Sequence, residues 1–384
     1  MKLLIISHKE TWEINRLKNE FQTTGGFPFQ INALSQLFDT TSLICTKRKS
    51  KRPNNLSLIQ GKNLIAKPVP EPPFHGLYRQ LTFFLWLPLH FQTIWNEVKS
   101  SDAVHALIPG DIGLVGLLIA IINKKPIFTR HCGTWGNRKT LTDKFIHWLL
   151  PRIAFGKNIV MGTGGGSTNP EPSNSNIKWI FSTSISDEEW KSIKPAKSWD
   201  GNETLKLVTV SRLSIGKNVQ SIIQALPEIS KHHSVHLNIV GDGDEYSGLT
   251  KLAKQIGVAS SITFHGNCNH SDVIKKLSNS HLFVFPTNTK EGFPKSLIEA
   301  MACGLPTIAT GVSVIPSLIE NKCGIVLDKT DPSSVSKAVI DMTSNLDQMK
   351  DMGKRARTIS KDYTLDHWRN VIGQRLKKAW GPLS

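Results

Sequence analysis

Short apolar runs alternate along the whole chain with segments of helical periodicity. The first half contains five runs of strand length, at residues 3–7, 42–45, 103–106, 126–129 and 158–161. The second half contains six more, at residues 206–210, 236–240, 261–264, 282–285, 306–309 and 324–327. Strands that alternate with helices in this way form parallel sheets whose two faces are covered by helices. The pattern therefore predicts an α/β protein built on doubly wound parallel sheets.

The length of the chain and one polar segment divide this pattern into two domains. At 384 residues the chain exceeds the size at which a single core usually splits. Residues 195–203, which include Asp200, Gly201 and Asn202, have the composition of a linker. We therefore predict an N-terminal domain over residues 1–195 and a C-terminal domain over residues 205–360. Ligands of open parallel sheets bind at the carboxyl ends of the strands.

Residues 81–95 form an apolar run that is open to two interpretations. The run is too short to span a bilayer, and Pro88 and His90 interrupt it. It predicts either a core helix of the first domain or an aromatic face that lies on a membrane interface. That face would contain Phe83, Phe84, Trp86, Phe91 and Trp95. A second run, at residues 112–122, predicts a helix buried against a sheet.

The net charge of +17 is concentrated in the first half of the chain. Residues 1–199 hold 25 Lys and Arg against 13 Asp and Glu, which gives +12. Such a surface attracts phosphates, nucleic acid or an anionic membrane. No part of the sequence resembles a zinc finger, a basic zipper or an aromatic RNA-binding platform. We therefore expect no nucleic-acid partner and favour an anionic lipid or polysaccharide surface.

The cysteines and the N-terminus indicate a reducing compartment. The five cysteines are widely spread and include no Cys-x-x-Cys pair, which argues against a disulfide scaffold or a zinc site. The chain turns polar at Ser7 and His8, too soon for the apolar segment of a signal peptide. These features predict a cytoplasmic protein, and the basic first half suggests a peripheral position at the inner face of a membrane.

Residues 291–306 combine the features of an anion-binding site. They follow a predicted strand and open a predicted helix at 294–303, which has proline at its start and glycine after its end. The first turn of a helix presents unpaired N–H groups and the positive end of a dipole, which suit a diphosphate. Glu291 precedes that turn and Glu299 follows it, so the two carboxylates can contact opposite ends of an extended ligand. Each can accept hydrogen bonds from two adjacent hydroxyls of a ribose or a hexose.

Four segments of the second half resemble the donor domain of GT-B fold glycosyltransferases, in particular the retaining family 4 (glycosyl transferases group 1). In the order found in that family, they are residues 211–217, 241–245, 264–267 and 291–306. The resemblance covers residues 205–380. It implies two Rossmann-like domains that face each other across a cleft. It also implies that residues 361–384 form a helix that crosses back to the first domain.

The resemblance assigns roles to individual residues. In that family, the positions of Arg212 and Lys217 hold the donor diphosphate, the position of Glu291 holds the sugar, and that of Glu299 holds the ribose. Two fixed cations stabilise the charge that develops on a departing nucleoside diphosphate, which a divalent metal does in other glycosyltransferases. We therefore expect a nucleotide-sugar donor, no metal and no cofactor.

Asp242, Gly243 and Asp244 spell a metal-binding Asp-x-Asp motif, but their context argues against a metal. They follow a predicted strand at a turn where the family has Gly-Asp-Gly, and glycine permits the backbone to approach a nucleotide closely. The predicted donor-binding residues are Gly25, Gly26, Arg212, Lys217, Gly241, Gly243, Gly266, Asn267, Glu291, Gly292, Phe293, Pro294, Ser296, Leu297 and Glu299.

The first half resembles the family less closely. Gly25 and Gly26 precede a predicted helix at 30–37, as in the family's glycine loop, but about seventeen residues separate them from the first strand. A plain helix-entry turn is the alternative. His131 follows a predicted strand where the family often places a histidine near the transferred sugar, and a packing histidine is the alternative. The predicted catalytic residues are His131, Glu291, Arg212 and Lys217.

The resemblance implies a retaining glycosyltransferase that transfers sugar from a nucleotide-sugar donor to a lipid-linked or polysaccharide acceptor in surface polysaccharide biosynthesis. No side chain is an evident covalent nucleophile, so we expect front-face attack guided by the leaving phosphate. A nucleotide-sugar epimerase is an alternative that the glutamate block disfavours. A non-catalytic anion- or nucleic-acid-binding protein is another, and sugar transfer with release of nucleoside diphosphate would exclude it.

Overall fold

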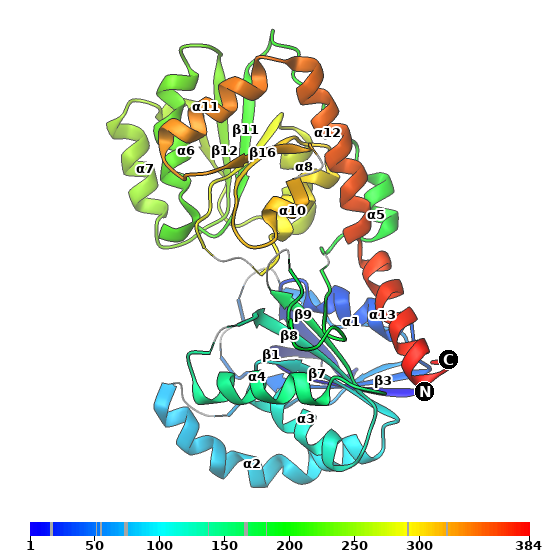
Figure 1. Ribbon diagram of the computed structural model, residues 1–384. Helices are drawn as coiled ribbons and strands as arrows, with labels where there is room; N and C mark the ends of the chain where they lie inside the picture. Colours follow the sequence, from blue (N-terminus) through cyan, green and yellow to red (C-terminus); the bar gives the residue numbers. More distant parts are fainter. Residues whose placement is uncertain are drawn as a thin grey trace. The chain divides into compact units, whose positions relative to one another are not determined.

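The protein folds into two compact units (Figure 1). The computed structural model describes residues 1–15, 18–50, 52–53, 56–72, 76–136, 138–164, 168–181, 183–289, 292–319 and 322–384. Unit 1 contains Met1–Ser184 and Trp368–Ser384, and unit 2 contains Ile185–His367. The division therefore precedes the predicted linker. The reason is that α5 (Asp187–Ser192) packs within unit 2. Arg357 Nη2 donates hydrogen bonds to the carbonyls of Trp190 and Ile193 at the C-terminal end of this helix.

Unit 1 is built on a parallel sheet with the strand order β10–β9–β8–β7–β1–β3, in which β3 also pairs with two short strands, β5 and β6. The strands are β1 (Lys2–Asn15), β3 (Thr40–Lys47), β5 (Leu64–Ala66), β6 (Val69–Pro70), β7 (Ala103–Ile108), β8 (Ile127–Thr134), β9 (Ile159–Gly164) and β10 (Lys178–Trp179). All five strands predicted in the first half lie in this sheet. Every residue of β7 is buried, as expected for a strand covered on both faces.

Helices cover both faces of this sheet. On one face, α2 (Gly76–Lys99), α3 (Asp111–Ile122) and α4 (Leu141–Ile153) share an apolar core with alternate residues of the strands. On the other face, α1 (Phe27–Ser35) and α13 (Leu365–Trp380) share a second core. From Trp368 onward the C-terminal helix belongs to unit 1, because its buried side chains join that second core.

An antiparallel ribbon beside the sheet was not predicted. β1 continues to Asn15 and pairs with β2 (Glu20–Thr24), which in turn pairs with β4 (Leu56–Leu58). The ribbon segments carry charged and polar residues at alternate positions, so they form no apolar run in the sequence. The continuation of β1 and the strand β2 account for the described residues between the first predicted strand and Thr24, apart from a turn before β2.

The aromatic residues of α2 do not share one exposed face, so that part of the membrane prediction is wrong. Trp86 is buried, with its Nε1 donating a hydrogen bond to the Pro70 carbonyl at 2.9 Å, while Phe83 and Trp95 pack against the core. The large hydrophobic side chains of α2 that are at least 74% exposed include Tyr78, Phe84, Leu85 and Leu89. The helix therefore packs on the core and also leaves an apolar stripe outside. Within the residues that the structure describes, no helix is long and apolar enough to cross a membrane.

Unit 2 is built on six parallel strands in the order β13–β12–β11–β14–β15–β16. They are β11 (Leu205–Val210), β12 (Val235–Val240), β13 (Ile262–Phe264), β14 (Leu282–Phe285), β15 (Thr307–Thr310) and β16 (Gly324–Leu327), which match the six predicted strands. Besides α5, the helices of this unit include α6 (Val219–Ile229), α7 (Tyr246–Gln255), α8 (His270–Ser278), α9 (Lys295–Ala302), α10 (Ile315–Ile319), α11 (Pro332–Thr343) and α12 (Leu346–Ser360). Short 3-10 turns occur at Ile215–Lys217, Ala259–Ser261 and Lys361–Tyr363. Each unit is thus a parallel α/β domain of the predicted class.

Candidate functional site

The loops that follow β11 and β12 interlock at the carboxyl edge of the unit 2 sheet. The Leu213 N–H donates to the Asp242 carbonyl at 2.9 Å, and the Gly241 N–H donates to the Gly266 carbonyl at 2.8 Å. Gly241 has a φ of +133°, and a Cβ there would lie 1.8 Å from the Ser211 carbonyl oxygen. Only glycine permits this approach. The loop that carries Arg212 is therefore packed directly on the predicted glycine turn.

Lys217 ends a 3-10 turn that is fastened to the end of β14. The Asn288 N–H and the Thr287 hydroxyl both donate to the Gly216 carbonyl, at 3.0 and 3.2 Å. The Lys217 ammonium lies 5.5 Å from the centre of the Phe285 ring, which places it in a cation–π contact. These contacts hold the ammonium over the carboxyl end of the strand.

The first residues of α9 lie at the same edge of the sheet. Pro294 is the N-cap of the helix, close to the predicted start, and the ring of Phe293 packs 5.4 Å from that of Tyr363. Glu299 lies further along the helix and is buried. The helix thus brings its open N-terminal turn and one buried carboxylate to the ends of the strands.

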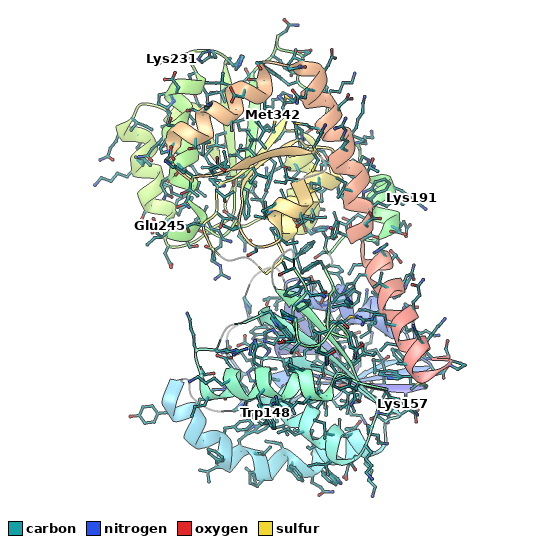
Figure 2. The ribbon with its side chains drawn as sticks, viewed as in Figure 1. Trp148, Lys157, Lys191, Lys231, Glu245 and Met342 are labelled. Carbon is teal, nitrogen blue, oxygen red and sulfur yellow. The ribbon has the colours of Figure 1, made fainter. Side chains whose placement is uncertain are left out.

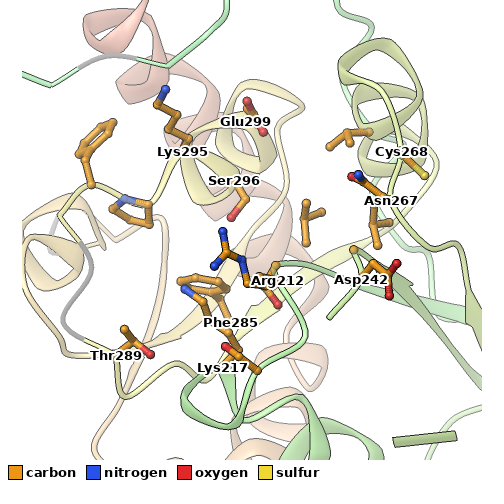
Figure 3. A pocket seen from close by; sticks show the side chains of 18 residues that line it. Arg212, Lys217, Asp242, Asn267, Cys268, Phe285, Thr289, Lys295, Ser296 and Glu299 are labelled. Atoms are coloured by element: carbon orange, nitrogen blue, oxygen red, sulfur yellow. The ribbon is translucent and has the colours of Figure 1, made fainter. Parts of the chain in front are cut away.

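These segments line a pocket of about 930 Å³ (Figure 3), which is a size typical of ligand sites. Figure 3 shows that the side chains of Arg212, Lys217 and Ser296 enter it from three different segments. The predicted residues that line the pocket are Arg212, Lys217, Gly241, Asn267, Phe293, Pro294, Ser296 and Glu299. Residues from four segments far apart in the sequence therefore form one site.

The other predicted residues of the second half that the structure describes are not among those that line the pocket. Gly243, Gly266 and Gly292 lie in the segments that carry the lining residues but do not line the pocket themselves. Leu297 is fully buried and is also absent from the lining. Glu291 lies outside the described residues. Lining residues that the sequence did not single out include Ser211, Ser214, Cys268, Phe285, Thr289 and Lys295. Ser211, Ser214 and Lys295 lie within the predicted segments, and Cys268 directly follows one. Phe285 ends a predicted strand, and Thr289 lies shortly before residues 291–306.

Residues 191–359 match the family model described as Glycosyl transferases group 1. This segment is a glycosyl transferases group 1 domain.

Curated relatives agree with this domain. The chain is 32% identical over 152 residues to the N-acetyl-alpha-D-glucosaminyl L-malate synthase of Bacillus anthracis. The aligned residues make up 39% of each protein. It is 29% identical over 179 residues to a GDP-mannose-dependent phosphatidylinositol monomannoside mannosyltransferase of Mycolicibacterium smegmatis, covering 44% of this chain and 46% of that protein. The matches thus span less than half the length of these relatives.

Solved structures share the fold of the whole chain. A glycosyltransferase from Rickettsia africae has a TM-score of 0.71 at 14% identity, covering 98% of both chains. Anabaena HepE in complex with UDP and glucose has a TM-score of 0.69 at 14% identity, covering 98% of this chain and 99% of that one. The predicted GT-B fold class is therefore confirmed, as is the resemblance read from the four sequence segments.

The two cations of the group 1 domain lie close enough to act on one another. Burial lowers the pKa of Lys217, and the nearby charge of Arg212 lowers it further. An anion that binds next to two neighbouring positive charges is attracted by both of them and offsets their mutual repulsion. The pocket is therefore electrostatically prepared for a polyanion at the end of β11 and β14.

The Asp242 carboxylate supports the glycine turn of this domain. Its Oδ1 accepts a hydrogen bond from the Gly243 N–H at 2.8 Å. In the part of the chain that the structure describes, no group of three His, Cys, Asp or Glu side chains is arranged to hold a metal ion.

The predicted residues of the first half lie in unit 1, outside the group 1 domain. Gly25 has a φ of +74°, and Gly26 is the N-cap of α1, so the pair forms the entry turn of that helix. His131 lies on β8 with its Nδ1 3.1 Å from the Gly133 carbonyl. Burial, and then the charge of His147, lower the pKa of His131 to about 4. The ring is therefore neutral at neutral pH. Because Nδ1 carries the proton toward the carbonyl, Nε2 is an acceptor.

Proposed function

We propose that this chain is a metal-independent, retaining glycosyltransferase of family 4 that uses a nucleotide-sugar donor. The observation that carries the proposal is the convergence of Arg212, Lys217 and the first turn of α9 in one pocket that also contains the buried Glu299. The two cations and the helix N-terminus suit a diphosphate. A carboxylate within the same pocket suits the paired hydroxyls of a ribose.

Each group has a distinct role in the proposed reaction. The acceptor hydroxyl attacks the anomeric carbon on the face from which the nucleoside diphosphate departs, so the bond to the diphosphate breaks as the glycosidic bond forms. The proton of the acceptor passes to the departing phosphate oxygen. Arg212 and Lys217 stabilise the negative charge that develops on the diphosphate. Glu291 orients the sugar, and Nε2 of His131 accepts a hydrogen bond from a sugar or acceptor hydroxyl.

The acceptor that we propose is a lipid-linked or polysaccharide molecule of surface polysaccharide biosynthesis. Names of similar proteins point this way: a phosphatidylinositol mannosyltransferase among the relatives, and WaaG, a glycosyltransferase involved in lipopolysaccharide biosynthesis, among the similar structures. WaaG has a TM-score of 0.62 at 16% identity, covering 99% of this chain and 100% of that one.

Transfer should proceed fully in EDTA, because side chains supply the positive charge that a metal would supply. The measurement is release of nucleoside diphosphate from UDP-, GDP-, ADP- and CDP-sugars in the presence of acceptor lipid extract, with a parallel thermal-shift screen of the free nucleotides. A nucleotide at 100 times its dissociation constant should stabilise the fold by about 2.7 kcal/mol. If EDTA-treated protein were inactive and Mg²⁺ or Mn²⁺ restored turnover, the metal-independent mechanism would fail. Nucleotide binding without any transfer would favour a non-catalytic binding protein.

We propose further that unit 1 binds anionic membranes at the cytoplasmic face. On the same face of the sheet as the α2 stripe, α4 exposes Leu141 and Trp148. Trp148 is labelled on this helix in Figure 2, and the Arg152 guanidinium lies 4.5 Å from its ring centre. Apolar and aromatic side chains beside basic ones suit the headgroup region of an anionic bilayer. The excess of Lys and Arg in residues 1–199 would also attract an anionic surface.

Vesicle flotation should show salt-sensitive binding to anionic vesicles and little binding to neutral ones. Changing Leu85 and Leu89 to serine should weaken flotation, because it removes apolar side chains from the proposed membrane-binding surface. Both side chains are largely exposed, so the change should not disturb the core. Leu346→Ser, at an exposed position of unit 2, is the matched control and should float as the wild type does. Equal binding to both kinds of vesicle, or none at low salt, would remove this proposal.

A further inference from the structure

His270 lies between two carboxylates beside the pocket. It is the first residue of α8, and its Nε2 lies 2.8 Å from Oε1 of Glu189 on α5. Its Nδ1 lies 3.7 Å from Oε1 of Glu299 on α9. All three residues belong to unit 2. Each ring nitrogen therefore faces a different carboxylate.

This arrangement favours a protonated imidazole. Only the imidazolium carries an N–H on both nitrogens, so only that form presents a proton to each carboxylate. The charge of Lys295, which comes from α9, opposes protonation, as does the positive first turn of α8. The hydrogen bond to Glu189 is the largest effect and raises the pKa of His270, even against burial.

Glu189 is held in place by the packing of α5. The Trp190 indole donates to the Ser360 hydroxyl at 2.9 Å and lies under the Arg357 guanidinium, which is 4.4 Å from the ring centre. Arg357 also donates to the backbone carbonyls of Trp190 and Ile193, both at 3.0 Å. A loose surface carboxylate would hold a histidine weakly, whereas this one is fixed by a packed helix.

Glu299 depends on cations more than an exposed carboxylate would. Burial raises its pKa, the charges of His270 and Lys295 lower it, and the charge of Glu189 raises it. Among the described residues, these are the charged groups that act on it from α5, α8 and α9. An ionised carboxylate accepts hydrogen bonds at both oxygens, whereas the protonated form loses acceptor sites that two ribose hydroxyls need.

We propose that His270 is a positioning residue for nucleotide binding, whose imidazolium keeps the Glu299 carboxylate ionised and oriented toward the pocket. The proposal rests on the proposed function, because it takes Glu299 as the group that binds the ribose. His270 itself is not among the residues that line the pocket. It therefore acts through Glu299 and not by touching the nucleotide.

The test is calorimetric titration of UDP, with GDP in parallel because the base is not identified, between pH 5.5 and 9. His270→Gln should bind about three- to tenfold more weakly than the wild type at pH 6, a loss between that of an exposed ion pair and that of a charged hydrogen bond. The two proteins should converge as the pH rises through the pKa of His270, because the wild type then loses the same charge. Ionisation of the nucleotide phosphates is common to all variants, so it cancels from the ratio.

Glu189→Gln provides a second, independent variant. It removes the hydrogen bond that raises the pKa of His270, so affinity should match the wild type at pH 5.5 and fall below it at neutral pH. Its side chain is partly exposed, so it also serves if His270→Gln does not fold. His233→Gln, which removes a histidine bonded to the Thr343 hydroxyl at 3.0 Å, is the matched control and should follow the wild type.

Two outcomes separate this inference from the proposed function. If Glu299→Gln binds UDP and GDP as the wild type does at every pH, the ribose role of Glu299 fails. If Glu299→Gln loses affinity but His270→Gln has either no defect or the same defect at every pH, the positioning role is overturned. A defect independent of pH would mean that the ring only fills space.

Discussion

Replacement of both Arg212 and Lys217 by alanine should abolish measurable sugar transfer and remove most of the affinity for free nucleoside diphosphate. Each cation can donate charge-assisted hydrogen bonds, and each such bond contributes about 1.5–3 kcal/mol. Both side chains line one pocket, and the charge of one lowers the pKa of the other. The loss of kcat should exceed the loss of binding, because charge on the diphosphate increases as the bond to the sugar breaks. Steady-state kinetics and calorimetry of the single and double variants measure both quantities.

The affinity for diphosphate should depend on which group replaces Arg212. Arg212→Lys keeps the charge but loses the planar fork of donors, so it should bind diphosphate more weakly than the wild type yet better than Arg212→Ala. Lys231→Ala, on an exposed cation paired with Glu228, is the matched control and should leave kinetics unchanged. Nearly normal transfer by the double variant would show that the diphosphate lies elsewhere.

The sheet of unit 2 could be predicted almost completely from the sequence. Its strands are rich in apolar residues because helices cover both faces, and β14 is a continuous apolar run that is buried at every residue. The loops of the site follow from the same rule, since parallel strands end at one edge. Gly241 could be anticipated as a turn residue. The structure shows why glycine is needed there, because a Cβ at this position would collide with the Ser211 carbonyl.

Other features could not be predicted because they depend on contacts between distant residues. Polar residues interrupt the apolar positions of the ribbon β1–β2–β4, so its sequence contains no apolar run that would indicate a strand. Both faces of α2 are apolar, so its periodicity could not tell that Trp86 packs inside while Leu89 lies outside. The pair His270 and Glu189 is separated by 81 positions, and neither residue belongs to a recognisable motif.

Glu291 and Glu299 should differ sharply in what their loss affects. Glu299 lines the pocket in the glycosyl transferases group 1 domain, and Glu291, whose role the family resemblance implies, precedes the same helix in sequence. If Glu299 binds the ribose, Glu299→Ala should weaken free nucleotide and intact donor alike. A charged hydrogen bond of about 1.5–3 kcal/mol corresponds to roughly 10- to 150-fold in affinity.

Glu291→Ala should leave the affinity for free nucleotide nearly unchanged, because its proposed partner is the sugar, which a free nucleoside diphosphate lacks. Transfer should fall by roughly 10- to 150-fold if the hydrogen bond is fully made in the transition state. Calorimetry with the nucleotide and steady-state kinetics with the donor separate the two effects. Asp351→Ala, which removes an exposed carboxylate paired with Lys354, controls for loss of negative charge alone. Near-normal transfer by Glu291→Ala would reduce that residue to a solvated charge, whereas a loss of nucleotide affinity would place it on the nucleotide and not on the sugar.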